Sequence, residues 1–195
     1  MADPKMATTH PVVTQLPLLS PKSAKDFKNC CLNYFVNAKG EIDDNIKVSC
    51  TLGCFENDLI NNWISFNCEH FTVLTFPEFM TKFRSRWLPY NWEQMLHGKI
   101  LSARLYPKKQ CFEDWASQIQ SLNVSLQGTV SHLDDDHICL QLEAGLDKDL
   151  QTIARDVKAH EEVSLHPWIA IIKDLDNCCI VQQKRVAEAI EEAIQ

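Results

Sequence analysis

The sequence predicts an all-helical fold with about nine helices and no convincing strand. Apolar residues recur at spacings of three and four along most of the chain, which is the period of one helix face. The chain has only five glycines and eight prolines among 195 residues, whereas strands need frequent turn residues. Nine phenylalanines, five tryptophans and three tyrosines supply ample material for a core. Composition and periodicity together therefore favour packed helices.

The N-terminal stretch differs from the rest of the chain. Three prolines stand among small and polar residues without a helical period, so residues 1–21 are predicted to form a flexible arm. A first helix begins near Pro21 and ends at Lys39 and Gly40, because glycine suits a left-handed C-terminal cap. One face of this helix carries Ala24, Phe27, Cys30, Cys31, Tyr34 and Phe35.

A second and a third helix follow. Asp43 or Asp44 can cap the second helix, because a carboxylate accepts from the first free amides. Gly53, near the end of this helix, either permits close packing or marks a frayed terminus. The second helix presents Ile46, Cys50, Gly53 and Cys54 on one face, and the third presents Phe55, Leu59, Trp63 and Phe66.

The sharpest local signal for a helix start is the segment Thr75–Glu78. The Thr75 hydroxyl can accept from the amide of Glu78, whose carboxylate can reach back, and Pro77 stands in the first turn, where a missing N–H costs nothing. Pro89 ends this helix, because the residue before a proline is pushed out of the helical conformation. The apolar stripe consists of Phe76, Phe79, Met80, Phe83 and Trp87.

Two helices are predicted after the short junction at Pro89. Asn91–Gln94 repeats the capping pattern, and the helix that it starts ends before Pro107. The next helix has the most regular stripe in the chain, and Gly128 closes it. The first of the two carries Met95, Leu96, Ile100 and Ala103, and the second carries Phe112, Trp115, Ile119, Leu122 and Leu126.

The C-terminal part predicts three more helices. Asp134–Asp136 stand where acidic residues favour a helix N-terminus, and Asp147 caps the helix after Gly145. Pro167 opens a long last helix whose pattern continues through Val186 and Ile190, with its acidic residues facing solvent. The apolar positions are Ile138, Cys139 and Leu142, then Leu150, Ile153, Ala154 and Val157, then Trp168, Ile169, Ile172, Leu175 and Cys179.

No sequence motif indicates catalysis, a metal or a cofactor. The cysteines and histidines lack the paired spacing of a zinc site, and Asp134–Asp136 have no second acidic motif at a matching position. Nucleophile-elbow, phosphate-loop and dinucleotide-binding motifs are absent. A formal charge of -7 repels a phosphate backbone, and no basic cluster offsets it. The chain is therefore predicted to be non-enzymatic, without cofactors, and to bind RNA only weakly.

The nine cysteines are predicted to be reduced. The sequence has no N-terminal signal-peptide pattern and no apolar run of the ~20 residues that a membrane helix needs. Cys30, Cys31, Cys50, Cys54 and Cys139 stand among apolar helical positions, as buried small hydrophobes do. These observations predict a cytoplasmic protein without a membrane partner.

The order of these signatures over residues 22–180 resembles the Gag family of gypsy-type long-terminal-repeat retrotransposons. A helix with Tyr34 and Phe35 precedes a helix with Trp63, and a helix that opens at Thr75 follows. Phe76 stands where the family often has Trp. Leu142–Leu146 is similar to the "f..GL" element that precedes the next helix in this family. The segment Gln110–Leu126 resembles the major homology region, but Cys111 replaces a glycine, and Gln118 or Gln120 stands in place of an arginine.

The resemblance implies a capsid with two small helical lobes, residues 22–89 and 90–180, and a C-terminal helix extension, residues 181–195. Its function would be structural: self-assembly, through pentamers and hexamers, into a virus-like particle shell that encloses retrotransposon RNA. The alternative is a domesticated Gag-derived adaptor that binds partner peptides. The residues expected to support the core and assembly are Phe27, Tyr34, Phe35, Trp63, Phe76, Phe79, Phe83, Trp87, Phe112, Trp115, Ile119, Leu122, Leu142 and Trp168.

Overall fold

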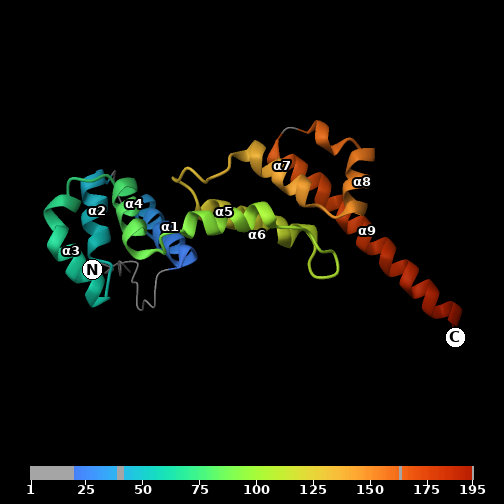
Figure 1. Cartoon of the computed structure of the whole chain (residues 1–195), viewed down its shortest axis with the longest axis horizontal. Coiled ribbons are helices and arrows are strands. Elements are labelled where there is room, and N and C mark those ends of the chain that lie inside the picture. Colours follow the sequence, from blue (N-terminus) through green and yellow to red (C-terminus); the bar gives the residue numbers. More distant parts are fainter. Residues whose placement is uncertain (1–19, 39–41, 163, 195) are drawn as a thin grey trace, which may run out of the picture. The chain divides into compact units, whose positions relative to one another are not determined.

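The computed structural model describes residues 20–38, 42–162 and 164–194, and over these residues the fold is all-helical, as predicted (Figure 1). Within that part of the chain there are nine α-helices and one short 3-10 helix. They are α1 (Pro21–Asn37), α2 (Asp44–Leu52), α3 (Asp58–Phe71), α4 (Phe76–Trp87), α5 (Trp92–Ser102), α6 (Phe112–Ser125), α7 (Asp135–Gly145), α8 (Lys148–Asp156), η1 (Ala159–Glu161) and α9 (Leu165–Ile194). None of them is long and apolar enough to cross a membrane.

The chain divides into two compact units, with the boundary between Trp92 and Glu93. The arm predicted for residues 1–21 lies almost wholly outside the described residues. Its last two residues belong to the start of α1, where the Ser20 hydroxyl accepts from the backbone N–H of Ser23 at 3.1 Å. The predicted end of the first helix at Lys39 and Gly40 also lies outside the described residues, and α1 ends at Asn37.

Unit 1 is built around aromatic side chains supplied mainly by α4. Phe79 and Phe83 of α4 have no exposed surface. Ring centroids lie 4.8 Å apart between Phe27 and Phe55 and 5.1 Å apart between Phe55 and Phe83, so residues from α1, the α2–α3 connection and α4 meet in one cluster. Aromatic pairs at such distances contribute about 0.5–1.5 kcal/mol each beyond the burial of their surface. Trp63 of α3 adds to the cluster with its ring 4.6 Å from that of Phe71.

The predicted capping box at the start of α4 is confirmed. The Thr75 backbone N–H donates to Glu78 Oε2 at 2.8 Å, and the Glu78 N–H donates back to Thr75 Oγ1 at 3.5 Å. This hydrogen bond from Thr75 N–H holds the pKa of the Glu78 carboxyl below its usual value. The predicted end is also confirmed, because Leu88 is the C-cap residue and has extended backbone angles before Pro89.

The apolar face predicted for the third helix is wrong at two of its four residues, Leu59 and Phe66. Leu59 is 66% exposed and Phe66 is 90% exposed, whereas Ile60 and Ile64 are buried. The cause is Asn57, whose side chain accepts from the N–H groups of Leu59 and Ile60 and so starts the helix after Phe55. Because Phe55 lies before α3, steps of three and four residues counted from Phe55 do not identify the residues of α3 that face the core.

At several other positions, a residue predicted to be buried is exposed or partly exposed. On α2, Ile46 is 52% exposed while Val48 is fully buried. Gly53 has nothing but the Cys50 carbonyl near its missing Cβ, at 3.7 Å, so it marks the end of α2 rather than a close contact. Of the five cysteines predicted to be buried, only Cys31 and Cys54 are; Cys30 is exposed, and Cys50 and Cys139 are partly exposed. Met95 of α5 is likewise half-exposed.

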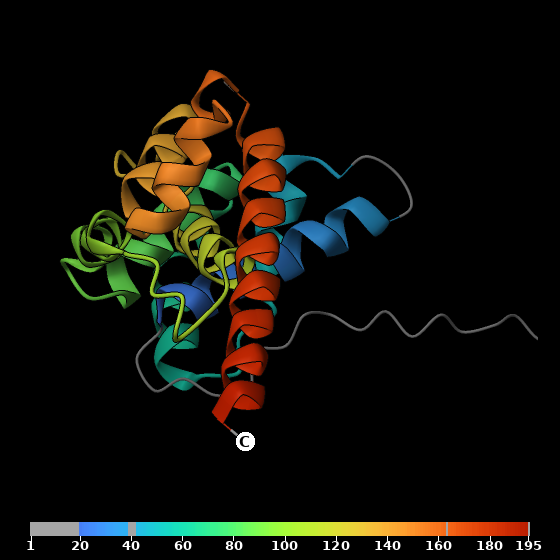
Figure 2. The same cartoon turned by 90° about the vertical axis from the view of Figure 1, so that its right-hand side faces the viewer.

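Unit 2 is organised by α9, the longest helix, which packs against α6, α7, α8 and η1. Trp168 and Ile172 of α9 are almost completely buried, and the Trp168 ring lies 6.0 Å from that of Phe112 in α6. The helix starts at Leu165, so Pro167 falls inside its first turn instead of opening it. Beyond Cys179 every described residue of α9 is exposed, and Figure 2 shows this half of the helix running past the rest of the unit.

Candidate assembly site

The start of α6 is held by a side chain from α9. The N-cap residue Cys111 makes no side-chain cap bond, and the Phe112 N–H instead donates to Asp176 Oδ2 at 2.8 Å. Asp176 is only 6% exposed. Its negative charge also lies at the positive end of the α6 dipole. One buried carboxylate therefore serves as a helix cap for a segment 64 residues away.

Sequence reasoning did not single out Asp176. A usable signal was present, because an acidic residue interrupts the apolar stripe of the last helix between Ile172 and Cys179. A charge at a core-facing position normally has a partner.

A second link between α6 and α9 is the exposed ion pair of Lys173 Nζ with Glu113 Oε1 at 2.7 Å, which raises the pKa of Lys173. Exposed pairs of this kind contribute little to stability.

A glutamine pair spans the start of α6. Gln118 Nε2 donates to Gln110 Oε1 at 3.1 Å, from the middle of α6 to the residue before its N-cap. Together with the Asp176 cap, this bond gives the start of α6 a local hydrogen-bond network.

A close contact joins α7 to α6 and to the end of α5. The Leu105 N–H donates to the Gly145 carbonyl at 2.8 Å, and Gln141 Nε2 donates to the Ile100 carbonyl at 3.1 Å. A Cβ atom on Gly145 would lie 2.6 Å from Cζ2 of Trp115 and 3.1 Å from the Ala103 carbonyl. Glycine at this position therefore lets α7 approach the buried indole.

The connection from α6 to α7 is held by one amide side chain. Asn123 is 8% exposed and exchanges two hydrogen bonds with Leu133, from Nδ2 to the carbonyl at 2.7 Å and from the Leu133 N–H to Oδ1 at 2.9 Å. Asp134 begins α7 directly afterwards and accepts from the His137 N–H at 2.9 Å. The predicted N-terminal role of the acidic run is thus confirmed for Asp134, and the Leu150 N–H bond to Asp147 confirms the same role there.

The fourteen residues predicted to support the core and assembly divide into two groups. Ten are buried: Phe27, Phe35, Phe76, Phe79, Phe83, Phe112, Trp115, Ile119, Leu142 and Trp168. Four are partly exposed: Tyr34, Trp63, Trp87 and Leu122. The buried residues belong to the two separate cores, so they hold each unit together from inside. Their predicted support of assembly stays a prediction.

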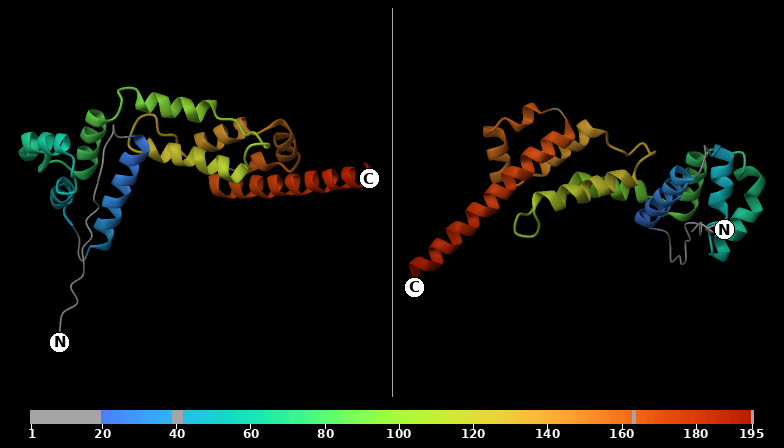
Figure 3. Two further views of the ribbon diagram at one scale, coloured as in Figure 1. Left: turned by 90° about the horizontal axis from the view of Figure 1, so that it is seen from below. Right: turned by 180° about the vertical axis from the view of Figure 1, so that it is seen from behind.

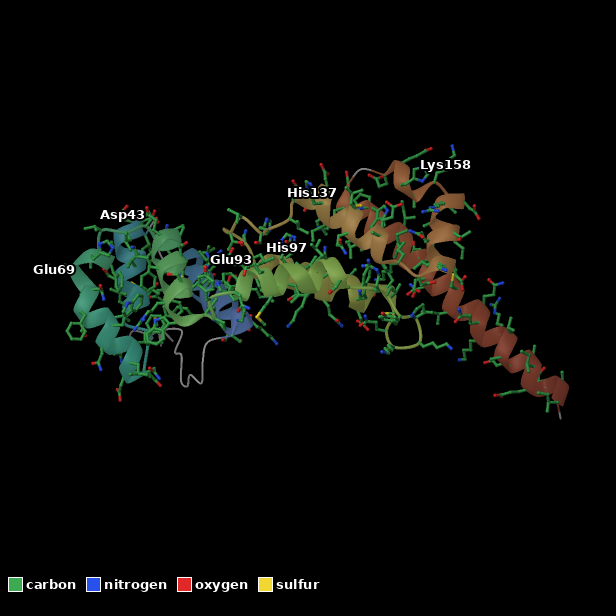
Figure 4. The ribbon with its side chains drawn as sticks, viewed as in Figure 1. Asp43, Glu69, Glu93, His97, His137 and Lys158 are labelled. Carbon is green, nitrogen blue, oxygen red and sulfur yellow. The ribbon has the colours of Figure 1, made fainter. Side chains whose placement is uncertain are left out.

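No group of side chains suited to a metal ion occurs among the described residues. Figure 4 shows His97, His137 and Lys158 of unit 2 on or beside different elements, α5, α7 and η1. A pocket of about 420 Å³ beside α8 and α9 is lined by Asp147 and Asp176, but both carboxylates already accept backbone N–H groups. His137 Nδ1 lies 2.6 Å from Asp134 Oδ1 at the start of α7, where both side chains are exposed to solvent.

Exposed apolar side chains are the more notable surface feature. In unit 1, the outward face of α3 carries Leu59 and Phe66, which are two turns apart and 66% and 90% exposed, and Val73 follows the helix at 73%. In unit 2, the exposed half of α9 carries Ile180, Val186, Ile190 and Ile194. Large apolar residues that gather on one exposed face typically mark contacts with another molecule.

Comparison of the chain with protein-family models, with curated proteins and with solved structures gave no match.

Proposed function

We propose that this chain is the capsid region of a retrotransposon Gag polyprotein, a structural protein that assembles with copies of itself into a shell around RNA. The observation that carries the proposal is the pair of exposed apolar helix faces, one in each unit, on α3 and on the end of α9. A protein with an exposed apolar face on each of its two units can contact several neighbouring copies, which a closed shell requires. Rings of five and six copies are the arrangement that the family resemblance suggests.

Further support comes from the segment that resembles the major homology region. The Gln110–Gln118 bond and the Asp176 cap supply a local network at the start of α6. The net charge of -7 favours a role in enclosing RNA over a role in binding it directly, because contacts with phosphates need clustered Lys and Arg. We expect any strong RNA contact of the Gag polyprotein to lie outside these 195 residues.

The test measures self-association of the purified chain by sedimentation velocity over a range of concentrations. The wild type is expected to form concentration-dependent assemblies, and Phe66→Asp to weaken them at least tenfold, because a charge would enter an apolar contact. Val130→Asp is the matched control, since Val130 is fully exposed on a loop outside both apolar faces. A wild type that stays monomeric at high concentration, or equal effects of the two variants, would contradict the proposal.

A stable monomer that instead captures peptides would favour the adaptor alternative. The two outcomes are distinct because an adaptor needs no contact between copies. Peptide capture is measured by screening the labelled chain against a peptide library and confirming hits by fluorescence anisotropy.

A further inference from the structure

The pocket of about 420 Å³ in unit 2 is lined by the start of α8, by α9 and by the connection that precedes α6. The helices α8 and α9 pack against each other, and both views of Figure 3 show them side by side. Pockets that bind small organic groups have volumes of about 300–1,000 Å³ and combine apolar walls with a few polar groups. This pocket has both the volume and the mixed lining.

The apolar part of the lining comes from three segments. Pro107 precedes α6, Leu150 belongs to α8, and Ile180 belongs to α9. Leu150 is almost completely buried, whereas Pro107 and Ile180 are exposed. The apolar lining therefore runs from the interior of the unit to its surface, which suits an aliphatic chain of a few carbon atoms.

The most deeply buried polar group of the pocket is Asp176, which is only 6% exposed. Its Oδ2 accepts from the Phe112 N–H at 2.8 Å, and no described residue donates a hydrogen bond to Oδ1. A buried carboxylate normally has donors for both oxygens, because an unpaired buried charge is costly. Asp176 therefore offers one buried acceptor to an occupant of the pocket.

A second acceptor comes from Asp147, the N-cap residue of α8. Its Oδ1 accepts from the N–H groups of Asp149 and Leu150 at 3.1 and 3.2 Å, and no described residue donates to Oδ2. The side chain of Asp149 lines the same pocket. Two carboxylates that are held in place by backbone N–H groups thus each keep one oxygen for a ligand.

The thiol of Cys179, which also lines the pocket, responds to these charges. Burial is the largest cause that raises the pKa of Cys179, and the carboxylates of Asp176, Asp147 and Asp149 raise it further. Their negative charges therefore act on a common space. This space favours a cation.

The two lysines of the lining leave the carboxylates available. Lys108 and Lys148 are exposed, and neither forms an ion pair with a described carboxylate. Within the described ranges no group of side chains is suited to a metal ion, which favours a larger, organic cation. A guanidinium fits better than an ammonium, because it is planar, is more weakly hydrated, and can donate to two carboxylates at once.

We propose that this pocket binds an alkylguanidinium, as the side chain of an arginine in a partner peptide presents it. The guanidinium would donate to Asp176 Oδ1 and Asp147 Oδ2, and its alkyl chain would lie against Pro107, Leu150 and Ile180. The inference goes beyond self-assembly and does not depend on it.

The first test titrates butylguanidinium, the isolated side-chain group, into the isotope-labelled full chain and follows backbone N–H signals by NMR. The signals of Phe112, Asp149 and Leu150 are expected to shift saturably, because these groups donate to the two carboxylates. Butylurea, an uncharged analogue of the same shape, is expected to bind at least fivefold more weakly. No saturable shift at these signals, or equal binding of butylurea, would overturn the proposal.

A parallel titration with N-acetylarginine methylamide tests the peptide source. It is expected to shift the same three signals. Binding of butylguanidinium without binding of the arginine derivative would refute a peptide as the ligand and leave a free small cation in its place.

The second test removes one charge without removing a helix cap. Asparagine caps helices as well as aspartate does, so Asp147→Asn should keep α8 intact and weaken butylguanidinium binding at least fivefold. Asp134→Asn is the matched control, because Asp134 caps α7 in the same unit but does not line the pocket. Equal affinities of the two variants would contradict the proposed contact.

The third test looks for a gain, which loss of folding cannot produce. Gln183 of α9 lines the pocket, so Gln183→Glu adds a negative charge there and should strengthen butylguanidinium binding at least twofold. Its neighbour Gln182 is also exposed but does not line the pocket, and Gln182→Glu should leave the affinity unchanged. Equal affinities of these two variants would show that charge in the pocket does not select the ligand.

Discussion

Replacing Gly145 with alanine should destabilise unit 2, although glycine is usually the poorer helix residue. Gly145 is buried at the last position of α7. The added Cβ would lie 2.6 and 2.7 Å from Cζ2 and Cη2 of Trp115, and 3.1 Å from the Ala103 carbonyl. Trp115 is 3% exposed, so its indole has little room to retreat. The backbone carbonyl blocks the other direction.

The magnitude follows from two opposing effects. Carbon atoms pack favourably at about 3.5–4.0 Å, so the new methyl would need roughly 1 Å of movement in a packed core. Overpacking of this kind costs about 1–3 kcal/mol. The change from glycine to alanine in a helix recovers about 0.5–1 kcal/mol. The net expected loss of unfolding free energy is about 1–2 kcal/mol.

Gly98→Ala is the matched control, because Gly98 lies within α5 and nothing is found within 4 Å of its missing Cβ. In this variant alanine favours the helix more than glycine does, and the new methyl group meets no other atom. It should therefore be about 0.5–1 kcal/mol more stable than the wild type. Urea unfolding of the full chain, followed by circular dichroism, measures both. If Gly145→Ala is as stable as Gly98→Ala, the close contact with Trp115 does not exist as described.

Three further predictions concern single side chains. Asp176→Ala should cost unit 2 about 1–3 kcal/mol in urea unfolding, because the buried Phe112 N–H loses its acceptor, while Asp176→Asn should cost less. Unit 1 should lose the stabilising contribution of Glu78 in acid, because the pKa of its carboxyl in the folded protein lies below the usual glutamate value. The contribution is present above the usual value and is lost as the pH falls through the folded pKa. The difference in unfolding free energy between the wild type and Glu78→Ala should therefore shrink over that pH range. Burial raises the pKa of Cys31 to about 12, so iodoacetamide at pH 8 should modify the exposed neighbour Cys30 much faster, and equal labelling by mass spectrometry would contradict the burial of Cys31.

The parts of the fold that could be predicted are those with a local cause. Thr75, Glu78 and Pro77 fix the start of α4 through bonds within one turn, and Asp147 does the same for α8. The stripe through Phe112 and Trp115 is regular enough to survive small errors of phase. Such features need no knowledge of what packs against them.

The parts that could not be predicted depend on contacts between distant segments. The Asn57 cap moves the start of α3 and so reverses which of Leu59 and Ile60 is buried. Asp176 caps α6 only because α9 crosses the start of that helix; its place in the apolar stripe signals a need for a partner, but a separation of 64 residues does not identify that partner. The exposed α9 face was visible as periodicity, but only the structure shows that unit 2 leaves it uncovered.

Negative-stain electron microscopy of the purified chain at high protein concentration tests the central claim of self-assembly most directly. The proposed capsid function predicts closed particles built from repeated copies of the chain, and it predicts their loss in Phe66→Asp but not in Val130→Asp. Monodisperse monomers under every condition of salt and concentration, without particles or rings, would contradict it.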